Sequence, residues 1–180
     1  MKKVENGGID LRTAEGAEAL LRSFLPCAEA NLVQEGYLAP VAFLIVTKHP
    51  ETKQRLVRPI IIPTLLDVGD NARKEISMNV LRTFAKRLDA IGCLLLLESW
   101  IAKVHSLEEA VSGPLPSERA DRKEVVTCVF EHQAFGTKLW TVDILRTSNG
   151  TPYLGDLEEG PNGGRLEGRM TGILPCGGLS

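Results

Sequence analysis

The chain has 180 residues, of which 43% are hydrophobic and 24% are charged, and its formal net charge is −2. This size suits one soluble domain with a sizeable core, and nothing in the near-neutral charge requires nucleic acid or an anionic membrane as a partner. The sequence contains neither a signal-peptide core nor a run of about 18 apolar residues, so we expect a cytoplasmic protein that does not cross a membrane.

The first expected element is a helix that follows a loose leader at residues 1–12. Thr13 is a suitable N-cap, and Gly36 is a suitable residue just beyond the helix end. Pro26 interrupts the pattern and predicts either a kink or two abutting helices. The apolar residues that recur at helical spacing are Leu20, Leu21, Phe24, Leu25, Ala28, Leu32 and Val33.

Two strands follow, at residues 41–47 and 56–62, joined by a turn around residues 49–53. Both strands are rich in β-branched and aromatic side chains, which favour extended structure. Pro59 cannot donate a hydrogen bond to a neighbouring strand, so it places the second of them at a sheet edge or a bulge.

A second helix begins at Asp70-Asn71 and is closed by Gly92. It is the clearest helical pattern of the chain, because its apolar residues repeat at intervals of four, four, four and three. These residues are Ile76, Val80, Phe84, Leu88 and Ile91. We expect this helix and the first one to cover the sheet.

Three further strands are predicted at residues 93–104, 125–132 and 138–146, and residues 105–123 form a polar connection. Four consecutive leucines, at 94–97, cannot all face one side of a strand, so both faces of the sheet must be covered. In the last two strands Val126, Cys128 and Phe130 share one face, as do Trp140, Val142 and Ile144, which indicates a hairpin.

From residue 149 the composition shifts, and nine of the last 32 residues are glycine. We therefore divide the chain into the leader, a single domain at residues 13–148 and a flexible tail rich in glycine and proline at 149–180. The fold class is α+β, in the order α-β-β-α-β-β-β, with a mostly antiparallel five-stranded sheet and two amphipathic helices. If the two helices lie on opposite faces of the sheet, the fold is a three-layer sandwich. If both lie on one face, a second subunit or the tail must cover the other face.

Over residues 14–147 this element order resembles that of the roadblock, longin and profilin-like folds. No sequence motif accompanies the resemblance, and a shared element order does not fix a function. Those folds usually end in another helix, which the Gly-rich tail does not provide.

No motif for phosphate, dinucleotide or catalytic metal binding is present, so we expect no cofactor and no metal. The cysteines at 27, 93, 128 and 176 are too far apart in sequence to form a zinc or redox motif, and we interpret them as reduced thiols. Weak catalytic candidates are Glu98, whose pKa would rise if it were partly desolvated, with His132 and Arg58 as helpers. The alternative is that Glu98 marks the end of the covered strand. Ser99, His132 and Asp143 have the residue types of a catalytic triad, but they come from three strands.

Candidate interaction residues are the indole at the strand end and two groups of basic side chains. They are Trp100, then Lys53, Arg55 and Arg58 around the first hairpin, and Arg82 and Lys86 on the second helix. The leading hypothesis is an intracellular, homodimeric protein-interaction module without catalysis, because both faces of the sheet are apolar and no catalytic signature occurs. The alternatives are a small hydrolase-type enzyme that uses Glu98 as acid or base, and a nucleic-acid accessory protein that uses the basic hairpin and helix.

Overall fold

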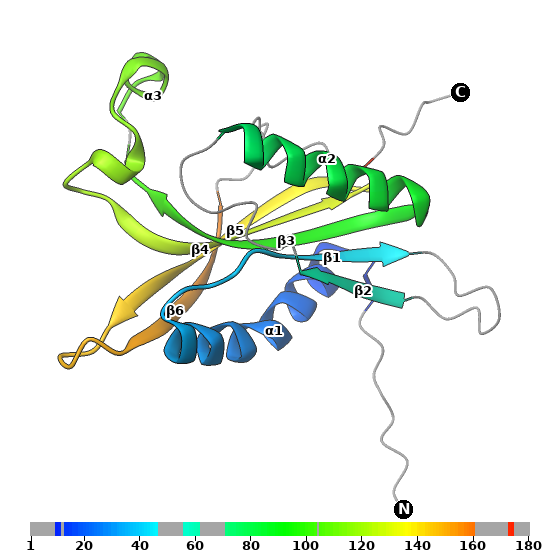
Figure 1. The fold of residues 1–180 in the computed structure, drawn as a ribbon, viewed down its shortest axis with the longest axis horizontal. Coiled ribbons are helices and arrows are strands. Elements are labelled where there is room, and N and C mark those ends of the chain that lie inside the picture. Colours follow the sequence, from blue (N-terminus) through cyan, green and yellow to red (C-terminus); the bar gives the residue numbers. More distant parts are fainter. Residues whose placement is uncertain are drawn as a thin grey trace, which may run out of the picture.

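The computed structural model of the protein describes residues 10–11, 13–46, 56–61, 71–103, 105–160 and 173–174. Its strands form one antiparallel sheet in the order β2-β1-β3-β4-β5-β6 (Figure 1). The strands are β1 (Val41–Val46), β2 (Leu56–Ile61), β3 (Ala90–Ile101), β4 (Lys123–His132), β5 (Gly136–Arg146) and β6 (Pro152–Glu159). The helical elements are α1 (Ala14–Glu35), α2 (Asn71–Arg87), the short α3 (Leu107–Ser112) and the 3-10 turn η1 (Pro116–Glu118). The α+β class and the predicted element order are confirmed.

The two long helices lie on opposite faces of the sheet, which gives three layers (Figure 1). The α1 face includes Phe43 of β1 and Leu96 of β3, packed against α1 residues such as Leu21. The α2 face includes Leu44 and Leu95, packed against α2. Alternation along each strand therefore fills two cores, which explains why β1 and β3 are apolar at nearly every position.

The sequence predicted α1 well. Thr13 caps its first turn by accepting a hydrogen bond from Gly16 N–H, and Gly36 ends it in the left-handed region with φ of 78°. Pro26 lies inside one continuous helix, which changes direction along its length (Figure 1). The expected loose leader is wrong at Leu11, which is buried against the α1 core.

Strand β2 is one edge of the sheet, as Pro59 predicted. The strand pairs with β1, where Pro59 lies opposite Phe43. An edge position tolerates proline because a backbone N–H that faces away from the sheet has no ladder partner to lose. The same proline makes this edge a poor template for pairing with another strand.

The end of α2 differs from the expectation. The helix stops at Arg87, the chain turns at Asp89 with φ of 50°, and β3 begins at Ala90. Gly92, expected to close the helix, is instead part of β3, where a Cβ atom would lie 3.0 Å from the His132 ring. A tight turn with an aspartate in the left-handed region thus replaces the expected glycine cap.

The buried face of α2 is also not the predicted one. Ile76, Val80 and Phe84 are 53%, 45% and 42% exposed, and we call these three residues the α2 stripe. The side chains that pack against the sheet are instead Ser77, Met78, Leu81 and Ala85. Helix α2 is therefore rotated about its axis relative to the expected orientation, with a different row of side chains toward the sheet.

The flexible tail is wrong for residues 152–159, which form the sixth strand. Strand β6 pairs with β5, and Leu154 and Leu157 pack on the α1 core. The chain therefore continues after β5 with a strand, where the roadblock, longin and profilin-like folds usually have a helix. Ile173 is buried in the α2 core, while residues 161–172 and 175–180 lie outside the described residues. The division into a leader, a domain and a tail otherwise stays a prediction.

Candidate functional site

The α2 stripe is the largest row of apolar side chains that the described helices leave exposed. Its three residues are four apart, so they lie on one side of the helix and extend over about 12 Å. Isolated exposed apolar residues are common on proteins, whereas a contiguous row on one helix face is typical of a docking surface. The sequence pattern identified these residues correctly but assigned them to the core.

The helix that carries the α2 stripe is strongly basic. Helix α2 contains five basic residues and one acidic residue, although the whole chain has a net charge of −2. Arg87 is seven residues from Val80, a spacing that corresponds to the same side of a helix. Lys86 is exposed, and Arg82 pairs with Glu75 at 3.2 Å.

Of the predicted interaction residues, the structure brings together Arg82 and Lys86, one helical turn apart on α2. Lys53 and Arg55 lie outside the described residues, and Arg58 is described for its backbone alone. Trp100 is 40% exposed and carries Arg122 over its ring at 4.8 Å. Its place on β3 is on the α1 face, so it does not extend the α2 stripe.

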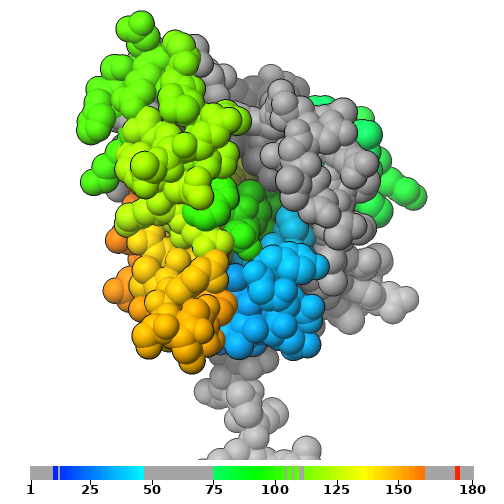
Figure 2. All heavy atoms as spheres, turned by 60° about the vertical axis from the view of Figure 1, so that its left-hand side comes forward, coloured from blue at the N-terminus to red at the C-terminus, as the bar shows by residue number. Residues whose placement is uncertain are grey.

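Glu98 lies on the α1 face, beside the loop that follows α1. One of its oxygens, Oε2, accepts a hydrogen bond from Leu38 N–H at 3.0 Å. Burial raises the pKa of Glu98, and the neighbouring Glu124 carboxyl raises it further, while Leu38 N–H and Arg146 lower it. Arg146 in turn pairs with Glu124 at 2.6 Å. Figure 2 shows this end of the molecule, where the chain after α1 (light blue) lies next to the β5–β6 hairpin (orange).

The Glu98 cluster does not include the catalytic helpers that the sequence suggested. His132 pairs with Gly92, six residues along β3 from Glu98, which corresponds to about 20 Å. Arg58 lies in register with Leu44, and Leu44 pairs with Cys93, which is five residues from Glu98. The cluster therefore consists of two carboxyls, which can share a proton, and a guanidinium that pairs with one of them.

The three residue types of a catalytic triad are not assembled either. Ser99 forms a hydrogen bond with Thr127, and Asp143 pairs with Lys123 at 2.8 Å. His132 lies on the opposite face, buried, with its ring stacked on Phe135 at a centroid distance of 4.6 Å. The His132 ring therefore belongs to the aromatic packing of the β4–β5 hairpin, and its Nδ1 accepts a hydrogen bond from Ala134 N–H at 3.1 Å.

Glu131 is a functional group that the sequence reasoning missed. It is 6% exposed on the α2 face and accepts hydrogen bonds from Ile173 N–H at 2.8 Å and Leu174 N–H at 3.2 Å. The carboxylate therefore holds a distant part of the chain against the α2 core. A carboxylate inside an apolar strand was the available signal, because such a group requires donors.

The described cysteines and acidic residues give no sign of a metal or redox site. Cys93 and Cys128 are buried, and burial raises the pKa of both thiols, to about 12 for Cys128. Cys27 is exposed on α1. Within the described parts of the chain, no three His, Cys, Asp or Glu residues are grouped to hold a metal ion.

Comparison with known proteins does not assign the chain to a class. No protein-family model matches it, and no curated protein or solved structure matches it at a significant level. Among the described helices, none is long and apolar enough to cross a bilayer. The surface chemistry of this structure is therefore what supports a function for the chain.

Proposed function

We propose that this protein is a protein-interaction module that docks a partner on the α2 stripe. The observation that supports the proposal is the half-exposure of Ile76, Val80 and Phe84 in a row. The other long helix, by contrast, presents its main apolar stripe to the sheet. A row about two helical turns long is what an amphipathic partner helix occupies when it lies in an apolar groove.

The charges around the stripe favour a partner segment with acidic flanks. An acidic amphipathic helix would place its apolar side on the stripe and its carboxylates near Lys86 and Arg87 at the C-terminal end of α2. Charge complementarity of this kind increases the association rate and excludes basic competitors.

The same charges disfavour a second copy of this chain as the occupant. Helix α2 contains five basic residues and one acidic residue, so any pairing of two α2 helices brings two strongly basic elements together. A parallel pairing also places Arg87 of one copy opposite Arg87 of the other. The repulsion between these like charges costs binding energy. Homodimerisation thus remains a prediction from the sequence, and a different protein is the occupant that we propose.

The experiment uses a designed probe of the proposed chemistry. A labelled 18-residue helical peptide with leucines on one side and glutamates on the other is titrated with the full chain, and anisotropy reports binding. A second peptide replaces every glutamate by lysine. We expect the glutamate peptide to bind, the lysine peptide not to bind, and Val80→Asp to weaken binding at least tenfold, about 1.4 kcal/mol. Asn79→Asp is the matched control, since it adds the same charge one position away on the exposed surface.

Three results would overturn the proposal. The first is a failure of the peptide titration itself. The glutamate peptide would then not bind, or it would bind no better than the lysine peptide, or it would bind Val80→Asp as tightly as the native chain. The second is a native dimer in light scattering that Val80→Asp converts to a monomer, because the occupant would then be a second copy. The third is stripe-dependent binding of nucleic acid or anionic vesicles with a steep dependence on salt, together with no binding of the glutamate peptide.

A further inference from the structure

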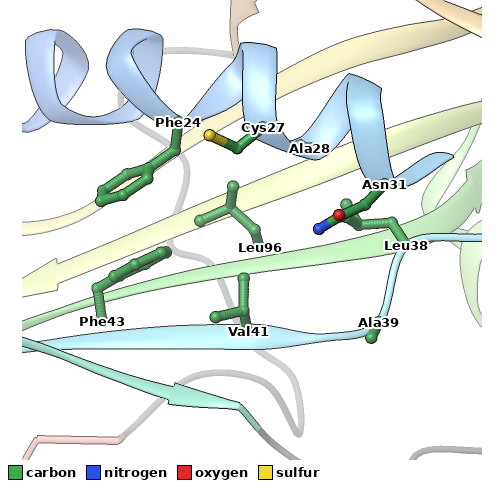
Figure 3. A pocket seen from close by; sticks show the side chains of 9 residues that line it. All are labelled: Phe24, Cys27, Ala28, Asn31, Leu38, Ala39, Val41, Phe43 and Leu96. Atoms are coloured by element: carbon green, nitrogen blue, oxygen red, sulfur yellow. The ribbon is translucent and has the colours of Figure 1, made fainter. Parts of the chain in front are cut away.

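A pocket of about 270 Å³ opens between α1 and β1, on the face of the sheet opposite the α2 stripe (Figure 3). Its floor is formed by Val41 and Leu96, and its wall by the C-terminal half of α1. The lining is mostly apolar and the space opens to solvent, so a small molecule can enter it and bury apolar surface there.

The chemistry of the walls limits what can occupy the pocket. Phe24 and Phe43 close one end with stacked rings, whose centroids are 4.1 Å apart. Asn31 stands at the other end, and Figure 3 shows its amide pointing toward the space above Leu96. None of the described residues that line the pocket has a charged side chain, so an ionic ligand would lose its hydration without compensation from them.

The volume sets the size of the ligand. Taking about 30 Å³ for each non-hydrogen atom, as for liquid water, the pocket holds about nine such atoms. We propose that the pocket is a binding site for a small, neutral, mainly aromatic molecule with one hydrogen-bonding group. The body of the ligand lies against Phe24 and Phe43, and its polar group meets the Asn31 amide. A ligand of this size binds with a Kd between about 1 μM and 1 mM.

Cys27 makes the proposal testable, because this exposed thiol also lines the pocket. The other described cysteines, Cys93 and Cys128, are buried with raised pKa values and react slowly with alkylating reagents. Replacing Cys176 by serine then leaves one reactive thiol, and its alkylation rate reports whether the pocket is occupied.

The experiment measures the alkylation of Cys27 by iodoacetamide in the full chain carrying Cys176→Ser, with and without indole. Indole is the probe because it is neutral and aromatic, has nine non-hydrogen atoms and carries one N–H donor. We expect indole to slow alkylation at least threefold in a saturable manner and to raise Tm, with phenol weaker and indole-3-acetate without effect. Alkylation of free glutathione under the same conditions is the control for the reagent.

Two variants separate binding in the pocket from effects elsewhere. Ala28→Leu fills the pocket from a buried position of α1 and should abolish protection by indole, whereas Ala30→Leu adds the same side chain at an exposed position and should not. Asn31→Ala, at an exposed position, removes the amide oxygen that would accept the indole N–H and should weaken the protection even if Ala28→Leu fails to fold. Lack of protection by both indole and phenol at their solubility limits would overturn the proposal, as would protection that Ala28→Leu and Asn31→Ala leave unchanged.

Discussion

The two long helices cover the same sheet in different ways. Helix α1 has four acidic residues and one basic residue, and it presents its main apolar stripe to the sheet. Helix α2 has the opposite charge balance and turns the α2 stripe outward, while Met78 and Leu81 face the sheet. Helix α1 therefore buries its main apolar stripe, whereas helix α2 combines a buried face with an apolar outer surface. The comparison teaches that amphipathic spacing identifies a helix without identifying which side is buried.

The largest expected effect comes from removing the C-terminal segment that begins at residue 149, because residues in it pack in both cores. Truncation after Ser148 removes β6, whose Leu154 N–H donates to Glu29 of α1 at 2.8 Å, and it removes Ile173 from the α2 core. We expect the truncated chain to lose cooperative unfolding, a loss comparable with a whole domain stability of about 5–15 kcal/mol. Denaturant unfolding followed by circular dichroism measures it.

A truncation after Leu174 is the control, because it keeps β6 and Ile173. We expect this chain to unfold cooperatively with a midpoint close to that of the full chain. If the chain that ends at Ser148 also kept a cooperative transition within about 1 kcal/mol of the full chain, residues 149–180 would be the dispensable tail that their composition suggests.

The next effect tests the comparison of the helices directly. Leu21→Ala in α1 removes a fully buried side chain and should cost about 2–5 kcal/mol, whereas Val80→Ala on the stripe should change stability by less than about 0.5 kcal/mol. Leu81→Ala, buried on the same helix as Val80, should resemble Leu21→Ala. Urea unfolding compares the three variants, and a Val80→Ala cost as large as that of Leu81→Ala would mean that the stripe is covered.

Much of the fold could be predicted from residues that act locally. Thr13 and Gly36 cap α1 through their own backbone neighbourhood, and the alternation of Val126 and Cys128 identifies a strand face without knowledge of the partner. Pro59 indicated an edge because the missing N–H is a property of the residue itself.

The features that could not be predicted depend on contacts between distant residues. Strand β6 contains Gly155 and weak alternation, and it is ordered by pairing with β5 and by Glu29, which is 125 residues away in sequence from Leu154. In α2, two apolar rows lie side by side, and the shape of the β1–β3 surface selects the row with Met78. Glu98 lies where β3 changes from buried to partly exposed positions, but its neighbour Glu124 follows from strand register, which no local pattern gives.

The buried carboxylate of Glu131 gives a test of the α2 side of the sheet. Glu131→Ala leaves the N–H groups of Ile173 and Leu174 without this acceptor and should cost about 1–3 kcal/mol. If the carboxylate acts by holding that segment, a double-mutant cycle with Ile173→Ala should be less than additive. Glu158→Ala on exposed β6 is the control. Fully additive costs would show that Glu131 and Ile173 stabilise the fold independently.

The smallest effect concerns the carboxylate on the α1 side. The folded-state pKa of Glu98 lies above its ordinary value of 4.5, chiefly through burial and then through Glu124. Between these two pKa values the folded chain binds more protons than the unfolded chain, so this group makes stability fall as pH rises.

Glu98→Gln keeps an acceptor for Leu38 N–H and removes the titration. The variant should therefore gain stability relative to the native chain as pH rises from 4.5 toward neutrality, by less than about 1 kcal/mol because water reaches the site. Urea unfolding at several pH values, with Glu158→Gln as control, measures the difference. If the difference in unfolding free energy between Glu98→Gln and the native chain stayed constant with pH, Glu98 would be fully solvated. The buried part of the α1 face would then not reach Glu98.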